Sequence, residues 1–131
     1  ALCETSPIPI ALDEELIGKY PLENKQQLLK LINPQYIVLK PGLLGGIESC
    51  EEWIEIADQM NINWWITSSL ESNIGLSAIA QWAYSKHSSL VHGLSTGNLF
   101  VNNIDSPLAL IGEKLYYFPR KKWNLSVLFN K

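Results

Sequence analysis

The sequence predicts an α/β fold in which four short strands alternate with helices and run parallel. Four brief apolar runs, rich in β-branched or aromatic residues and bounded by turn formers, are typical of buried strands: residues 8–12, 36–39, 64–66 and 90–91. The segments between them carry apolar residues at helical spacing. Strands that alternate with helices in this way are parallel and joined by right-handed crossovers.

The first strand–helix pair combines strand 8–12 with a helix over residues 23–33. Apolar residues gather on one side of this helix, and the spacing places Lys25 and Lys30 largely on the other, polar side. Because Asn33 precedes a proline, its α conformation is disfavoured, and we expect the helix to end there.

The second pair joins strand 36–39 to a helix over residues 49–60. Ser49 is the expected N-cap, and Glu52 three residues later completes the pattern of a capping box. The glycine-rich turn between them, residues 42–46, lacks the lysine of a phosphate-binding loop. A third helix over residues 73–87 precedes strand 90–91, and a less regular tail from Gly97 contains a further strand at 115–118.

The strand ends recur at a fixed interval. Asp13, Lys40, Thr67 and Leu94 mark the four ends and follow one another every 27 residues. A fixed period indicates a repeated architecture, and a (β/α)₈ TIM barrel uses about 30 residues for each strand–helix unit. We therefore predict a partial (β/α)₈ barrel over residues 1–104 and a C-terminal tail over 105–131. A small doubly wound sheet is the alternative.

Composition narrows the function classes. The 131 residues carry a net charge of −3, which argues against nonspecific nucleic-acid binding, and no apolar stretch approaches the roughly 20 residues that span a membrane. Cys3 and Cys50 are too few for a disulfide framework or a zinc site, so we expect a cytoplasmic location. The chain starts at Ala1 without a Met, and we expect it to be a piece of a longer protein.

Polar residues follow each predicted strand. Parallel strands bring their carboxyl ends to one rim, where catalytic groups of barrel enzymes lie, so Asp13, Lys40 and Thr67 are expected to converge. An acid that holds a cation, facing a lysine, suits abstraction of a proton next to a carboxylate. A structural ion pair of Lys40 with Asp13 or Glu14 is the alternative. His87 and His92 are expected to be structural, and no base lies beside the serines after Thr67.

Four motifs in this order resemble the C-terminal half of the barrel of enolase-superfamily enzymes, and more narrowly the o-succinylbenzoate synthase family. They are residues 10–14 (Ile-Ala-Leu-Asp-Glu), 36–41 (Tyr-Ile-Val-Leu-Lys-Pro), 66–72 (Ile-Thr-Ser-Ser-Leu-Glu-Ser) and 92–97 (His-Gly-Leu-Ser-Thr-Gly). The resemblance covers roughly residues 2–104 and implies that the four strands are strands five to eight of the barrel.

The resemblance implies a Mg²⁺-dependent dehydration of 2-succinyl-6-hydroxy-2,4-cyclohexadiene-1-carboxylate to o-succinylbenzoate, a step of menaquinone biosynthesis. It assigns Asp13 to the metal and makes Lys40 the catalytic lysine that faces the enediolate, where it stabilises the enediolate as a cation or serves as acid/base. Glu14 is implied as a partner of Lys40 that does not touch the substrate.

The same resemblance places Thr67 and Gly93 against the carboxylates of a small-molecule substrate, with Ser95 and Thr96 beside them. Residues 95–97 stand where the related dipeptide epimerases have Asp-x-Asp, which favours the synthase. Other enolase-type reactions, a cycloisomerisation or an acylamino acid racemisation, and a noncatalytic interaction module remain alternatives.

The family also uses two earlier metal carboxylates and a Lys-x-Lys lysine, on strands that would precede this chain. We therefore expect the 131 residues alone to bind Mg²⁺ weakly and to lack synthase activity. A half barrel leaves two open strand edges, so we expect self-association, or pairing of an edge with the tail at residues 110–118.

Overall fold

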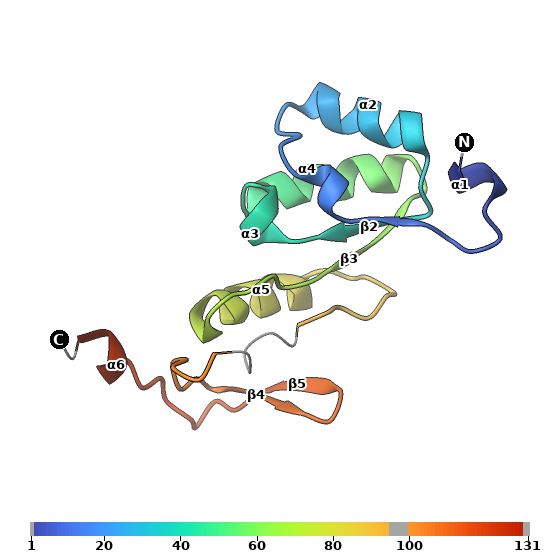
Figure 1. Ribbon diagram of the computed structural model, residues 1–131. Coiled ribbons are helices and arrows are strands. Elements are labelled where there is room, and N and C mark those ends of the chain that lie inside the picture. The colour runs from blue at the N-terminus through green and yellow to red at the C-terminus, as the bar shows by residue number, and fades with distance from the viewer. Residues whose placement is uncertain (1, 95–99, 130–131) are drawn as a thin grey trace. The chain divides into compact units, whose positions relative to one another are not determined.

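The computed structural model describes residues 2–94 and 100–129 (Figure 1). The chain forms two compact units: the first holds residues 1–67 and 87–93, and the second holds residues 68–86 and 94–131. The elements of the first unit are α1 (Leu2–Thr5), β1 (Ala11–Leu12), the 3₁₀ turn η1 (Glu14–Leu16), α2 (Leu22–Ile32), β2 (Tyr36–Leu39), α3 (Pro41–Leu44), α4 (Ile47–Gln59) and β3 (Asn63–Ile66).

A parallel sheet in the order β1-β2-β3 forms the centre of the first unit. β2 has the predicted bounds, whereas β1 is shorter than the predicted strand 8–12. Pro9 has no N–H to give to a neighbouring strand, and the N–H of Ile10 donates to Oε1 of Gln35 at 2.9 Å instead of to a backbone carbonyl. The prediction of parallel strands alternating with helices is confirmed.

The predicted strand at residues 90–91 is wrong. Val91 is 89% exposed, and among the described residues the pairing of this segment with β3 is limited to a parallel bridge between Thr67 and Gly93. The N–H of Ile66 donates to Nδ1 of His92 at 3.1 Å. A side chain thus accepts the hydrogen bond that a backbone carbonyl would accept in a regular ladder.

Helices α2 and α4 cover the sheet, with α4 packed against β2 and β3 and α2 packed against α4 (Figure 1). Asparagines in the left-handed conformation close both helices: Asn33 with φ 49° after α2 and Asn61 with φ 56° after α4. The N–H groups of Asn61 and Ile62 return to the carbonyls of Asp58 and Ala57, which is a Schellman motif. The predicted end of the first helix at Asn33 is confirmed.

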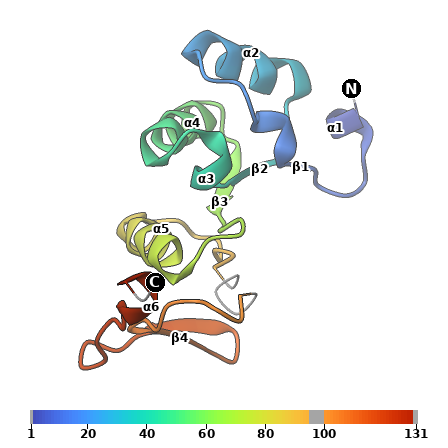
Figure 2. The same cartoon turned by 60° about the vertical axis from the view of Figure 1, so that its left-hand side comes forward.

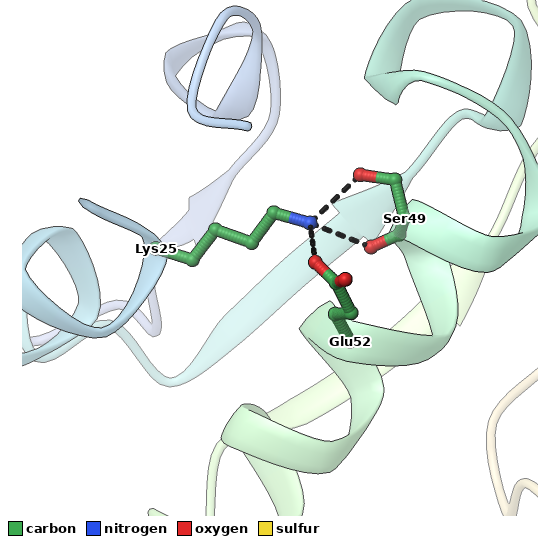
Figure 3. Close-up of polar contacts among 3 residues, drawn as sticks. All are labelled: Lys25, Ser49 and Glu52. Carbon is green, nitrogen blue, oxygen red and sulfur yellow. Dashed lines mark hydrogen bonds and ion pairs between the residues drawn. The ribbon is translucent and has the colours of Figure 1, made fainter. Parts of the chain in front are cut away.

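Two predictions about these helices are wrong. Lys25, expected on the polar side of α2, is completely buried. The capping box is absent from the start of α4: this helix begins at Ile47 after Gly46, which has φ 98° and makes no side-chain cap. Ser49 and Glu52 instead bind the ammonium of Lys25 (Figure 3).

The second unit contains α5 (Asn73–Ser85), β4 (Leu108–Ile111), β5 (Lys114–Tyr117) and α6 (Ser126–Phe129). The predicted tail strand is confirmed as β5, which pairs antiparallel with β4 in a two-stranded sheet of its own (Figure 1; Figure 2 shows β4 from another side). Pairing of the tail with an edge of the parallel sheet, the alternative to self-association, stays a prediction. Asn73 ties α5 to the tail, since its side-chain amide donates to the carbonyl of Ile104 at 2.6 Å. Within the described ranges, no helix combines the length and apolar character needed to cross a membrane.

Candidate functional site

Asp13 and Lys40 meet at the carboxyl edge of the parallel sheet. Asp13 follows β1 and Lys40 follows β2, and the Lys40 ammonium donates from Nζ to Oδ2 of Asp13 at 2.7 Å. The Asp13 side chain is 42% exposed and that of Lys40 is 19% exposed. The two predicted residues thus converge as a partly exposed ion pair.

The turn after β2 sets the orientation of Lys40. Because Lys40 precedes Pro41, its backbone is restricted to the extended region, and its φ is −115°. Pro41 then occupies the first position of α3, where a missing N–H costs nothing. The Lys40 carbonyl accepts hydrogen bonds from the N–H groups of Leu43 and Leu44 at 2.9 and 3.0 Å. The backbone of Lys40 is therefore held in place between the end of β2 and the start of α3.

Thr67 and Gly93 form a second contact on the same sheet. The N–H of Thr67 donates to the carbonyl of Leu39 at 2.9 Å, which places Thr67 directly beside the end of β2. Its hydroxyl donates to the carbonyl of Gly93 at 2.7 Å. A Cβ at position 93 would lie 2.8 Å from Oγ1 of Thr67, so this approach requires glycine.

The other predicted site residues are distributed as follows. Glu14 lies in η1 with an exposed side chain, and the carboxylate that contacts Lys40 is that of Asp13. Ser95 and Thr96 lie outside the described residues. His92 holds Ile66, and burial lowers the pKa of its imidazole, which suits the structural role expected for it.

Asp13 has the chemistry of one magnesium ligand. Its half-exposed carboxylate offers the hard oxygen donors that Mg²⁺ prefers. Across residues 2–94 and 100–129, no group of three or more His, Cys, Asp or Glu side chains is placed to hold a metal ion. Within these residues, Asp13 alone could therefore supply one oxygen ligand to such an ion.

Sequence reasoning missed the environment of Lys25. A signal was present, because residues 25, 28, 29 and 32 follow the i, i+3, i+4, i+7 spacing of the apolar stripe of α2. A lysine within such a stripe is buried only when its ammonium is fully paired.

Relatives of known name match most of the chain. No family model matches it. The o-succinylbenzoate synthase of Desulfotalea psychrophila is 53% identical over 112 residues, which are 86% of this chain and 30% of that protein. The o-succinylbenzoate synthase of Vibrio cholerae is 35% identical over 105 residues, 76% of this chain and 30% of that protein. The chain thus spans under a third of the length of these relatives.

Solved structures give the same correspondence. The crystal structure of MenC from Desulfotalea psychrophila matches with a TM-score of 0.82 and 52% identity over 87% of this chain and 32% of that chain. A muconate cycloisomerase variant matches with a TM-score of 0.76 over 98% of this chain and 36% of that chain, and its 21% identity shows the fold alone. The sheet and its helices are therefore part of a (β/α)₈ barrel, and the chain is homologous to the C-terminal part of the o-succinylbenzoate synthases of the enolase superfamily.

Proposed function

We propose that this chain is part of an o-succinylbenzoate synthase. This lyase dehydrates 2-succinyl-6-hydroxy-2,4-cyclohexadiene-1-carboxylate to o-succinylbenzoate in menaquinone biosynthesis. The observation that carries the proposal is the 53% identity with a synthase over 112 residues. Since these residues are 30% of that relative, the activity belongs to a longer protein, and the 131 residues alone are expected to be inactive.

Lys40 is the proposed catalytic residue. An ammonium has three N–H donors, and one is directed at Asp13. The other two can hold the oxygens of an enediolate as negative charge develops there. A preorganised donor of this kind stabilises the transition state more than the ground state. The Lys40 side chain is 19% exposed, so part of it is accessible at the end of β2.

Asp13 is the proposed metal-binding residue of this part of the enzyme. When bound, Mg²⁺ supplies positive charge at the substrate carboxylate and so favours formation of the enediolate. Asp13 contributes one carboxylate, and the ion pair with Lys40 holds that carboxylate at the carboxyl edge of the sheet. Glu14, on the turn that starts at Asp13, is proposed as a partner of Lys40 that does not itself touch the substrate.

Thr67 and Gly93 are the proposed substrate-binding residues, together with Ser95 and Thr96. The support for Thr67 is that it follows β3 directly and lies beside the end of β2, the strand that precedes Lys40. The contact between Thr67 and Gly93 fixes the backbone there, so that polar groups of this segment can meet a substrate carboxylate. We place the protein in the cytoplasm, which suits its two free cysteines.

We also propose that the isolated chain associates with itself. β1 is an edge of the sheet, and the opposite side of β3 makes, within the described part of the chain, one bridge at Thr67. Unpaired strand edges attract other strands, and Ile8 beside β1 is 71% exposed.

A complementation assay tests the synthase proposal. The chain is mixed or coexpressed with the remaining N-terminal part of the Desulfotalea psychrophila synthase, and product formation is followed by ultraviolet absorbance. We expect activity in the mixture and none from either part. Lys40→Ala should lower kcat by about 10²–10⁴-fold, whereas Lys30→Ala, on the exposed side of α2, should not. Activity of the complemented Lys40→Ala variant equal to that of the parent would refute the role of Lys40.

A further inference from the structure

The ammonium of Lys25 is fully coordinated by α4. Figure 3 shows Nζ of Lys25, from α2, between Ser49 and Glu52 of α4. It donates to the carbonyl and the hydroxyl of Ser49 at 3.0 and 2.7 Å and to Oε2 of Glu52 at 2.7 Å. The centroid of a Trp53 ring lies 5.4 Å from Nζ. All three N–H donors of the ammonium are therefore used, and we call these four residues the Lys25 cluster.

Stability alone is a weak reason for a lysine at this position. The Lys25 side chain has no exposed surface, and removing a charge from water costs free energy that an ion pair often does not recover. A methionine of similar length would bury its stem equally well. The lysine offers something else, because three acceptors fix both the direction and the distance between α2 and the first turn of α4.

Backbone hydrogen bonds connect this first turn to Lys40. The N–H of Cys50, beside Ser49, donates to the carbonyl of Gly46 at 3.2 Å. The N–H of Gly46 donates to the carbonyl of Pro41 at 2.9 Å, and the N–H of Leu44 to that of Lys40 at 3.0 Å. These hydrogen bonds tie the first turn of α4 to the backbone of Lys40.

A similar series of backbone hydrogen bonds connects Lys25 to Asp13. The N–H of Lys25 donates to the carbonyl of Pro21 at 3.2 Å, and the N–H of Lys19 to that of Leu16 at 3.4 Å. The N–H of Leu16 donates to the carbonyl of Asp13 at 3.3 Å.

Tyr20 lies between these two turns, and its ring packs against Gly45, in the segment that runs from Lys40 to Ser49. A Cβ on Gly45 would lie 2.9 Å from Cε1 of Tyr20. The segment from Asp13 to Lys25 and the segment from Lys40 to Ser49 thus lie against one another and are joined at both ends, by the Asp13–Lys40 ion pair and by the Lys25 cluster.

We propose that Lys25 is a positioning residue for Lys40. By tying α2 to the first turn of α4, it sets the spacing at which Lys40 meets Asp13, a task that the two-residue strand β1 leaves largely to the helices. The proposal deepens the proposed function and rests on it for its catalytic meaning.

Labelling of Lys40 with an amine-reactive reagent, read by mass spectrometry, tests this proposal on the chain itself. In the parent, Asp13→Asn should raise the labelling rate of Lys40 by about two- to fivefold, as expected for a partly exposed ion pair. In Lys25→Met, the Lys40 rate should already be raised, and Asp13→Asn should add nothing further. Lys30→Met is the matched control and should behave as the parent.

The urea midpoint separates positioning from stability. Glu52 is 43% exposed, so Lys25→Met strands no buried charge on α4, and the midpoint should stay close to that of the parent. A lowered midpoint with Lys40 labelling and its response to Asp13→Asn unchanged would overturn the proposal. If Lys25→Met does not fold, Ser49→Ala decides: it removes one of the three acceptors and should raise Lys40 labelling in the same direction, and an unchanged rate would overturn the proposal.

This test and that of the synthase proposal fail separately. Labelling requires no catalysis, so it reports positioning even if Lys40→Ala proves harmless in the complementation assay. If both proposals hold, Lys25→Met in that assay should lower kcat and leave KM unchanged, because Lys25 touches no substrate.

Discussion

The N–H of Ile66 donates to Nδ1 of His92, so a histidine side chain completes the hydrogen bonding of β3. The ring lies stacked on Trp64, with centroids 6.3 Å apart and planes inclined by 14°. A ring nitrogen that accepts a hydrogen bond carries no proton, which makes this imidazole neutral. Burial acts in the same direction and lowers the pKa of His92.

We predict that acid destabilises the first unit through His92. In the unfolded chain its pKa has the ordinary value of about 6.5, and in the folded chain it is lower. The unfolded state therefore binds more protons, so the stabilisation is complete above about pH 6.5 and is lost as the pH falls through the folded pKa. Urea midpoints measured between neutral and mildly acidic pH should fall accordingly.

Two histidine variants are the controls for this pH dependence. His92→Asn keeps an acceptor without titrating, and the slope of its urea midpoint against pH should be smaller than that of the parent. His87→Asn, which replaces an exposed histidine, should keep the slope of the parent. Parallel slopes for His92→Asn and the parent would contradict the prediction.

Gly93→Ala should destabilise the first unit by about 1–3 kcal/mol, because the new Cβ would lie 2.8 Å from Oγ1 of Thr67. Thr67→Ala removes that oxygen, so the double variant should lose less stability than the two single variants together. Urea denaturation of all four proteins measures this coupling. Strict additivity would mean that the two residues are not in contact.

The Asp13–Lys40 pair should contribute little to stability. Because the Asp13 side chain is 42% exposed, water screens the pair, and Asp13→Asn or Lys40→Met should each change the free energy of unfolding by less than about 1 kcal/mol. Such a result, read from urea denaturation, is expected of a site and not of a structural ion pair in an interaction module. A loss of several kcal/mol in either variant would favour the module.

The thiol of Cys50 should be unreactive in the folded chain. Burial raises its pKa to about 12, so at mildly alkaline pH only a minute fraction is thiolate, the species that reacts with iodoacetamide. We expect carboxamidomethylation of Cys50 only after unfolding in urea, as measured by peptide mass spectrometry. Rapid labelling without urea would contradict the burial of this residue beside the Lys25 cluster.

Sedimentation velocity tests self-association through the sheet edge. We expect the mean sedimentation coefficient to rise with concentration. Ile8→Lys places a charge beside β1 and should weaken this rise. Leu31→Lys, which replaces a 78% exposed leucine on α2, is the matched control and should not. A single monomer species at all concentrations would refute self-association.

Local sequence patterns correctly predicted the features that are set by residues close together in the sequence, such as the bounds of a strand. The apolar run before Lys40 was sufficient to place β2, and the 27-residue spacing was sufficient to bring Asp13 and Lys40 to one edge of the sheet. Two of the predictions that were wrong, the capping box and the strand at 90–91, concern contacts between residues far apart in the sequence. Ser49 fits a capping box when α4 is considered alone, and only the approach of α2 gives its hydroxyl to Lys25. The strand at 90–91 failed for the same reason, because the imidazole of His92 replaces a backbone partner of β3.

Helices α2 and α4 end in the same way, with an asparagine in the left-handed conformation before the next strand. Asn33 stands where the backbone turns toward β2, and Asn61 stands where it turns toward β3. Asparagine tolerates this conformation better than most residues with a side chain, and glycine adopts it without steric cost. Asn33→Gly and Asn61→Gly should therefore be accepted alike, so the two helix exits can be engineered as a matched pair.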